Sequence, residues 1–298
     1  MLEGLFDSSV NLTIIALFGA MIFVGRLAAC GGYCPKLLFL RRWLGVLFYS
    51  FSGAACLEFF GLERDFGVLL FCGAALYFLV ITAYSWIVIC SENFGEDIPP
   101  RFGPVDDAWM DSPKYADLMR RIEAAGYKKS GSFEMKIDQE LELSQLATTF
   151  DGGNARLCVI FPFGDGSTMV ASAKTVLEDG TVLLTEARNI PNGFDYPENY
   201  APENHPFVSD PVALLKLHAQ RLEKSGKAPA KRICAPFDDL NCAVNAEIAA
   251  SQKSGLTNPV RYWEDDGVFT EDGKFRFWKI SLITAYFPFL IAGAKRSV

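Results

Sequence analysis

The stretch FGVLLFCGAALYFLVITAYSWIVIC, residues 66–90, decides the fold class of this chain. It contains no charged residue and is longer than the roughly 20 apolar residues that a helix needs to cross a bilayer. Two earlier stretches, Leu12–Cys30 and Trp43–Gly61, are comparably apolar. Residues 1–90 are therefore expected to form an N-terminal block of three transmembrane helices.

Composition divides the rest of the 298-residue chain into three further parts. Half of all residues are hydrophobic, and this excess is concentrated at the two ends of the chain. Residues 91–110 are acidic and contain several prolines, which is typical of a linker. Residues 111–275 have the pattern of a water-soluble domain, and residues 276–298 are expected to form a C-terminal transmembrane or re-entrant segment.

Charge separates the soluble domain from the membrane block. Residues 91–275 contain 30 Asp and Glu against 19 Lys and Arg. Such an acidic surface repels phosphate backbones, so nucleic acid is not expected as a partner of this domain. The remaining residues carry a basic surplus, which places the lipid bilayer with its anionic headgroups among the expected partners.

Basic residues also predict the orientation in the membrane. Arg26 near the end of the first expected span is followed by Lys36, Arg41 and Arg42 before the second, with no acid among them, whereas the N-terminal tail carries only Glu3 and Asp7. Because basic loops stay in the cytoplasm, the N-terminus is expected outside. The second and third spans form a hairpin, so the soluble domain is expected to be cytoplasmic. The expected location is the cell membrane, plasma or inner, as a multi-pass protein.

Two features leave this topology open. Leu27–Gly31 resembles the cleavage box of a lipoprotein, which would lipidate Cys30, although the acidic N-terminal tail lacks the basic region of a signal peptide. Phe277–Gly293 is at the lower limit of spanning length, and crossing would place Lys295 and Arg296 outside, against the charge rule. An interfacial or re-entrant helix would remove that conflict.

Small residues predict where the transmembrane helices pack. They recur four residues apart in the first two spans and cluster in the third, which favours close helix contact or self-association through these helices. Glu58 is the one acid inside a span. It fits either a side chain that snorkels to the interface or an ion site in a conduit formed by oligomerisation. The packing candidates are Ala16, Ala20, Ser50, Ala54 and Gly73.

The soluble domain is expected to be α+β, with helices on one face of an antiparallel sheet. Alternating apolar residues between glycine-containing turns predict strands, whereas capping residues before apolar stripes predict helices. The proline-rich connection at 190–211 is typical of an ordered loop. Helices are expected to begin at Asp111 or Ser112, at Asp210, and at Asp238 or Asp239. Strands are expected at 133–137, 141–143, 155–163, 168–177 and 181–188. A final hairpin is expected at 261–263 and 268–277.

Few residues are candidates for catalysis or for metal binding. The chain has only two histidines, His205 and His218, which excludes a multi-histidine metal site, and it has no phosphate loop. His218 lies on the apolar stripe of an expected helix, which is typical of a core histidine. As a catalytic base, either histidine would need a nearby carboxylate such as Glu203 or Asp210. No metal or cofactor is expected.

These patterns favour a non-enzymatic component of a membrane complex. Its soluble domain would act as a scaffold, sensor or accessory subunit that binds a partner protein. A membrane-tethered enzyme that uses His218 or His205 with nearby carboxylates is the main alternative. A small conduit formed by oligomerisation is the third hypothesis.

Overall fold

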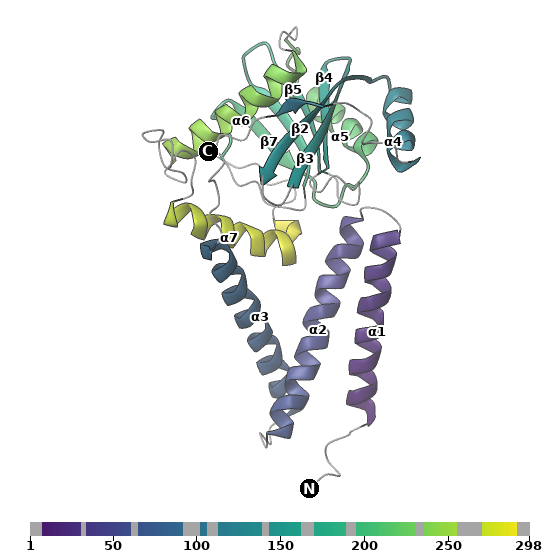
Figure 1. Ribbon diagram of the computed structural model, residues 1–298, viewed down its shortest axis with the longest axis vertical. Coiled ribbons are helices and arrows are strands. Elements are labelled where there is room, and N and C mark those ends of the chain that lie inside the picture. Colours follow the sequence, from purple (N-terminus) through teal and green to yellow (C-terminus); the bar gives the residue numbers. More distant parts are fainter. Residues whose placement is uncertain are drawn as a thin grey trace. The chain divides into compact units, whose positions relative to one another are not determined.

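Two compact units make up the chain, Met1–Glu92 (unit 1) and Asn93–Val298 (unit 2). The described part of unit 1 is helical, and unit 2 combines a sheet with helices (Figure 1). The structure is a computed structural model that describes residues 8–30, 34–60, 65–91, 102–105, 113–138, 143–161, 170–188, 195–230, 235–254 and 270–290.

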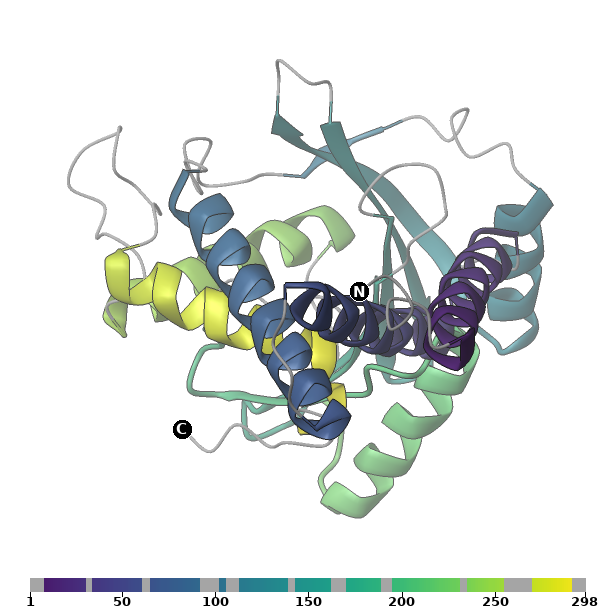
Figure 2. The same ribbon diagram turned by 90° about the horizontal axis from the view of Figure 1, so that it is seen from below.

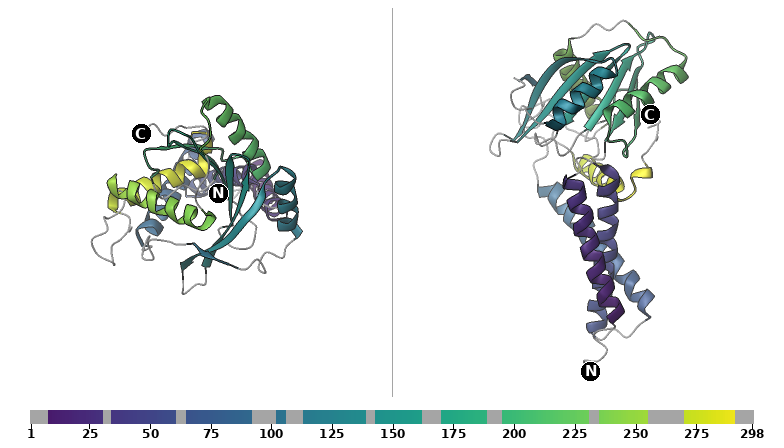
Figure 3. Two further views of the ribbon diagram at one scale, coloured as in Figure 1. Left: turned by 90° about the horizontal axis from the view of Figure 1, so that it is seen from above. Right: turned by 90° about the vertical axis from the view of Figure 1, so that its right-hand side faces the viewer.

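Unit 1 contains the helices α1 (Ser8–Cys30), α2 (Pro35–Phe59) and α3 (Phe66–Ser91). α1 and α2 lie side by side, and α3 crosses α2 (Figures 1 and 3). Phe18 of α1 packs on Phe48 of α2 with ring centroids 5.5 Å apart. Aromatic side chains therefore fill part of the space between the first two helices.

Two helices of unit 1 are long and apolar enough to cross a membrane, α1 over Ser9–Leu27 and α3 over Phe66–Cys90. α2 does not belong to this set. Basic residues occupy its first turns and Glu58 its last turn, so its uncharged part is limited to residues 43–57. Among the described residues there are thus two candidate spans, where the sequence predicted three.

Unit 2 has the expected α+β class and is built on a seven-stranded mixed sheet in its described part. The strands follow one another across the sheet in chain order. Neighbours from β1 to β6 are antiparallel, and β7 is parallel to β6. The strands are β1 (Gly103–Pro104), β2 (Lys128–Asp138), β3 (Leu143–Gly152), β4 (Ala155–Phe161), β5 (Val170–Val176), β6 (Val182–Ala187) and β7 (Tyr200–Asn204).

Strand β7 corrects two expectations, a wholly antiparallel sheet and an irregular loop over residues 190–211. Val182 pairs with Tyr200, so the chain returns to the start of β6 before it enters β7. A strand that starts beside the start of its neighbour must run parallel to it. Pro202 has no N–H to offer a further strand, which blunts this edge of the sheet.

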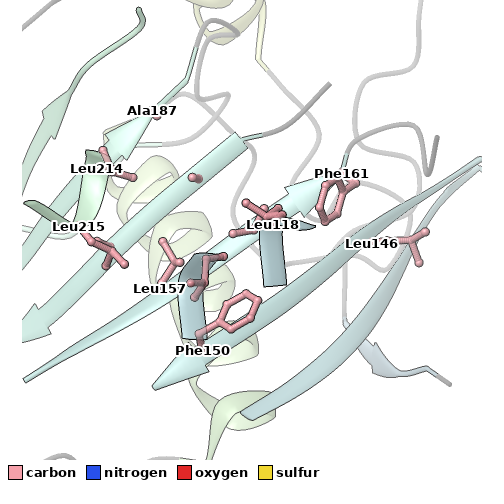
Figure 4. Packing of buried hydrophobic residues seen from close by; sticks show 12 residues of the cluster. Leu118, Leu146, Phe150, Leu157, Phe161, Ala187, Leu214 and Leu215 are labelled. Carbon is pink, nitrogen blue, oxygen red and sulfur yellow. The ribbon is translucent and has the colours of Figure 1, made fainter. Parts of the chain in front are cut away.

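Helices cover both faces of the sheet, whereas one covered face was expected. α4 (Pro113–Ala124) and α5 (Pro211–Ser225) contribute to the larger core, and α6 (Pro236–Lys253) packs on the smaller core across the sheet (Figure 2). Successive strand residues point to opposite faces, so Leu157 of β4 lies in the larger core and Cys158 in the smaller one. Figure 4 shows the larger core.

Local signals explain where α5 begins and ends. The Asp210 side chain accepts a hydrogen bond from the Val212 N–H, Pro211 occupies the first turn, and Gly226 follows the last turn with a φ of 63°. Each is a common terminal signal of a helix. α6 differs, because it begins at Pro236 without a side-chain cap, although Asp238 or Asp239 was expected to start it.

Helix α7 (Glu271–Tyr286) replaces the extended segment expected at 268–277. The Thr270 hydroxyl accepts a hydrogen bond from the Gly273 N–H, and two acidic residues in the first turn favour the helix dipole. The helix ends before Pro288, which opens the short 3₁₀ helix η2 (Pro288–Leu290). Residues 261–263, the other half of the expected hairpin, lie outside the described residues.

Candidate functional site

His218 is held at both ring nitrogens between α5 and the sheet. Its side chain is buried, with Nε2 2.8 Å from Thr175 Oγ1 and Nδ1 2.8 Å from Thr185 Oγ1. Thr175 donates its hydroxyl hydrogen to the Asn154 carbonyl at 2.8 Å, so it accepts a hydrogen from Nε2. Nδ1 then accepts the Thr185 hydroxyl hydrogen. The ring is therefore the neutral Nε2–H tautomer.

The surroundings of His218 oppose its protonation. Burial lowers the pKa of His218 to about 4, and the positive charge of Arg221 is the second cause. Arg221 donates hydrogen bonds from one guanidinium nitrogen to Thr185 Oγ1 at 2.8 Å and to the Leu184 carbonyl at 2.6 Å. His218 is thus a neutral polar group that joins α5 to β5 and β6.

Arg221 extends these contacts to β7. Its Nε lies 2.7 Å from Glu203 Oε2, and another of its nitrogens donates to the Ala201 carbonyl at 3.0 Å. The second oxygen of Glu203 lies 3.0 Å from His205 Nε2, a contact without hydrogen-bond geometry. The side chains of Glu203 and His205 are 20% and 22% exposed, so this end approaches the surface.

Three of the four predicted chemical candidates thus belong to one connected set of side chains. We call it the α5 polar chain. The fourth, Asp210, lies apart from it, because it caps α5 and pairs with Arg121 of α4 at 2.8 Å. The α5 polar chain consists of Thr175, His218, Thr185, Arg221, Glu203 and His205.

Sequence reasoning missed three members of the α5 polar chain. Arg221 follows His218 by three positions, which places both on one helix face and was the one local signal available. Thr175 and Thr185 lie 43 and 33 residues from His218, and only the register of β5 and β6 brings them to the ring.

A second buried polar group lies on the α6 side of the sheet. Arg156 is 3% exposed and pairs with Asp151 at 2.7 Å and with Asp239 at 3.0 Å. Lys174 reaches the other oxygen of Asp239 at 2.7 Å. Two bases face two acids, so the buried charges are matched. This network fixes the first turn of α6 to β4 and β5.

Glu186 places a buried carboxylate on the same face, at β6. The Tyr196 hydroxyl donates to its Oε2, and Arg188 Nε lies 2.8 Å from its Oε1 without hydrogen-bond geometry. Burial and then the charge of Glu186 raise the pKa of Tyr196 well above its ordinary value. The contact ties the segment after β6 to the sheet.

The buried thiol on this face is not disposed to act as a nucleophile. Burial raises the pKa of the Cys158 thiol to about 12, so the reactive thiolate is scarce at neutral pH. Among the described residues, no group of three or more His, Cys, Asp or Glu could hold a metal ion.

In unit 1, the structure brings three of the membrane candidates together. A Cβ on Gly73 of α3 would lie 2.4 Å from the Ser50 carbonyl oxygen and 3.1 Å from the Ala54 nitrogen of α2. The two backbones therefore touch, and only glycine fits at this crossing. Of the remaining candidates, Ala16 and Glu58 are exposed and Ala20 is half-buried.

Comparison with known proteins adds nothing to the contacts described above. No protein-family model, curated protein or solved structure matches the chain. The geometry of the α5 polar chain, the α6 network and the apolar helices therefore carries the functional argument.

Proposed function

We propose that this chain is a multi-pass protein of the cell membrane whose unit 2 binds a partner protein as a scaffold, sensor or accessory subunit. The apolar surface of unit 1 carries the proposal. Phe23, Phe71 and Leu79 are 62%, 75% and 67% exposed, and most of the exposed large apolar side chains in the described residues belong to α1, α2 and α3. Water disfavours such surface by about 25 cal/mol per Å², whereas lipid tails accept it.

We assign α2 the role of third span. It contacts both α1 and α3, and its charged residues lie near its two ends, where long side chains can reach the headgroups. With three crossings, the basic N-terminal end of α2, with Lys36, Arg41 and Arg42, lies on the same side of the membrane as unit 2. The charge rule then favours a cytoplasmic unit 2 and an external N-terminus.

The polar groups of unit 2 support binding in preference to catalysis. Both ring nitrogens of His218 are engaged by threonines, and the Cys158 thiol is kept protonated by burial. A catalytic base or nucleophile must instead present a free atom to its substrate. The buried charges of Arg156 are likewise matched within the fold.

Photo-crosslinking in cells tests partner binding directly. A photoreactive amino acid is placed singly at Glu223 on α5 or at Asn245 on α6, two exposed positions on the helices that cover opposite faces of the sheet. We expect a discrete heavier adduct from one position, identified by mass spectrometry, with the other position as the matched control. Absence of an adduct from either position, across growth conditions, would contradict a stable partner on these helix faces.

A membrane-tethered enzyme is the second candidate, because His205 and Glu203 lie 3.0 Å apart at a partly exposed site. A carboxylate close to an imidazole can orient the ring as a general base once the two form a hydrogen bond. If this pair is catalytic, His205→Gln abolishes cellular function while the melting temperature stays unchanged. Glu203→Gln would have the same effect. Retention of full function in His205→Gln rules this candidate out.

A further inference from the structure

The exposed apolar side chains of unit 2 gather at its C-terminal end. Phe275, Phe289 and Leu290 are 53%, 55% and 61% exposed, and the one other large apolar residue in this class among the described residues of unit 2 is Val176. All three belong to α7 or η2. Apart from Val176, the described residues of the sheet and its other helices keep their large apolar side chains covered, so this patch needs a specific explanation.

The charge of the unit reverses after the two acids in the first turn of α7, Glu271 and Asp272. Residues 273–298 contain five Lys or Arg and no acid, although unit 2 as a whole is acidic. Lys279 is exposed on α7, whereas Lys274 is 19% exposed and pairs with Glu271 at 3.2 Å. Basic side chains interleaved with exposed aromatics match the interface of an anionic bilayer, which attracts the charges and accepts the rings.

Helix length excludes a crossing by α7. Beyond Lys279 the helix continues only to Tyr286. This part is about 10 Å long at 1.5 Å per residue, a third of the roughly 30 Å hydrocarbon core. Pro288 then prevents the same helix from continuing.

One side of α7 is fixed to the rest of unit 2. Arg276 forms two hydrogen bonds with the Asp195 carboxylate, at 2.8 and 3.0 Å, and the Asp195 N–H donates to Ser251 of α6. Neighbouring residues of a helix point about 100° apart, so Phe275, which packs on Trp278 and is 53% exposed, points away from this attachment. A tethered helix with an outward apolar edge is suited to lie along a surface.

We propose that α7 and η2 lie in the plane of an anionic bilayer surface and hold unit 2 against it. Phe275, Phe289 and Leu290 enter the boundary between headgroups and acyl chains, while Lys279 contacts anionic headgroups. The inference rests on the proposed membrane location of unit 1. For the described residues 276–290, it replaces the transmembrane or re-entrant alternatives with a segment that lies along the interface.

Depth-dependent quenching of fluorescence, measured on the full-length chain in lipid vesicles, tests this assignment. A fluorescent amino acid is introduced singly at Phe275 or Phe289, and vesicles contain lipids brominated at shallow or deep positions. We expect shallow quenching at both sites, stronger with phosphatidylglycerol than with phosphatidylcholine alone. The same label at Val176 should stay unquenched, and at Leu79 of α3 it should be quenched in both lipids.

Charge variants separate headgroup attraction from apolar insertion. Lys279→Gln should lower the bound-to-free ratio of the Phe275 label on phosphatidylglycerol vesicles by about fivefold. On phosphatidylcholine the variant should match the parent. An equal ratio on phosphatidylglycerol would overturn the electrostatic part of the proposal.

The control positions keep the two proposals distinguishable. Unquenched labels at Phe275 and Phe289 beside a quenched label at Leu79 overturn the interfacial helix and leave the membrane location standing. Quenching of Phe289 mainly by deep bromines overturns it in favour of a crossing or re-entrant segment. An unquenched label at Leu79 refutes the membrane location of α3 itself.

Discussion

Mild acid is expected to destabilise unit 2 through His218. The pKa of His218 is lowered to about 4 in the folded chain, first by burial and then by the charge of Arg221. In an unfolded chain the imidazole has a pKa of about 6.5. Between these values the unfolded chain binds a proton that the folded chain does not, so stability falls as the pH falls.

The two pKa values fix the size of the effect. Their difference corresponds to about 3 kcal/mol once the pH is below both values. Between pH 7 and pH 5 the expected loss is about 2 kcal/mol, because protonation of the unfolded chain is then nearly complete. Such a loss is a large fraction of the stability of an ordinary domain, which is about 5–15 kcal/mol.

Hydrogen exchange at the amides of β5 and β6, followed by mass spectrometry of the full chain in detergent, measures the opening free energy at each pH. His205→Gln is the matched control, since it removes the other histidine and should keep the acid-induced loss. His218→Gln should have lower stability at pH 7 but a smaller loss on acidification. A His218 ring signal that titrates near pH 6.5 in NMR would refute the reasoning.

Three further predictions concern packing and reactivity. Gly73→Ala should destabilise the contact between α2 and α3 by about 1–3 kcal/mol, because its Cβ would collide with the α2 backbone, whereas Gly19→Ala meets no atom within 4 Å and should be tolerated in thermal denaturation. Buried Cys158 should be alkylated at least about a hundredfold more slowly than exposed Cys242, as followed by intact mass. Tyr196→Phe should cost about 1–3 kcal/mol in chemical denaturation, because it removes the hydrogen bond to a buried carboxylate.

Elements with strong local signals were predictable from the sequence. α5 has its cap, its first-turn proline and its terminal glycine within one short segment, Asp210 to Gly226. α3 is recognisable because an uncharged run as long as Phe66–Cys90 has few alternatives to a helix of membrane length. Local chemistry determines both of these, without help from distant residues.

Elements set by distant contacts were mispredicted. β7 has no alternating apolar pattern, and its parallel direction follows only from pairing with β6. β3 extends to Gly152 although the pattern predicted a strand only at residues 141–143. The first part of α7, up to Phe277, was expected to be extended, because its aromatic residues resemble a strand; the Thr270 cap indicates a helix instead.

The candidate site was predictable only in its residue types. A histidine on the apolar face of α5 was expected to be a core group, and the bonds from Thr175 and Thr185 now give the physical reason. These partners come from strands whose register the sequence does not specify. The contact of His205 with Glu203 depends in the same way on the position of β7. The sequence could therefore suggest this pair but not the distance between the two side chains.

Cysteine accessibility in intact cells tests the proposed membrane topology most directly. Cys242 is exposed on α6, and a cysteine introduced as Ser9→Cys lies at the start of α1; each is kept as the single thiol and treated with a membrane-impermeant maleimide. We predict labelling of Ser9→Cys in intact cells and labelling of Cys242 only after permeabilisation. Labelling of Cys242 in intact cells would contradict a cytoplasmic unit 2 and reverse the orientation proposed for α1, α2 and α3.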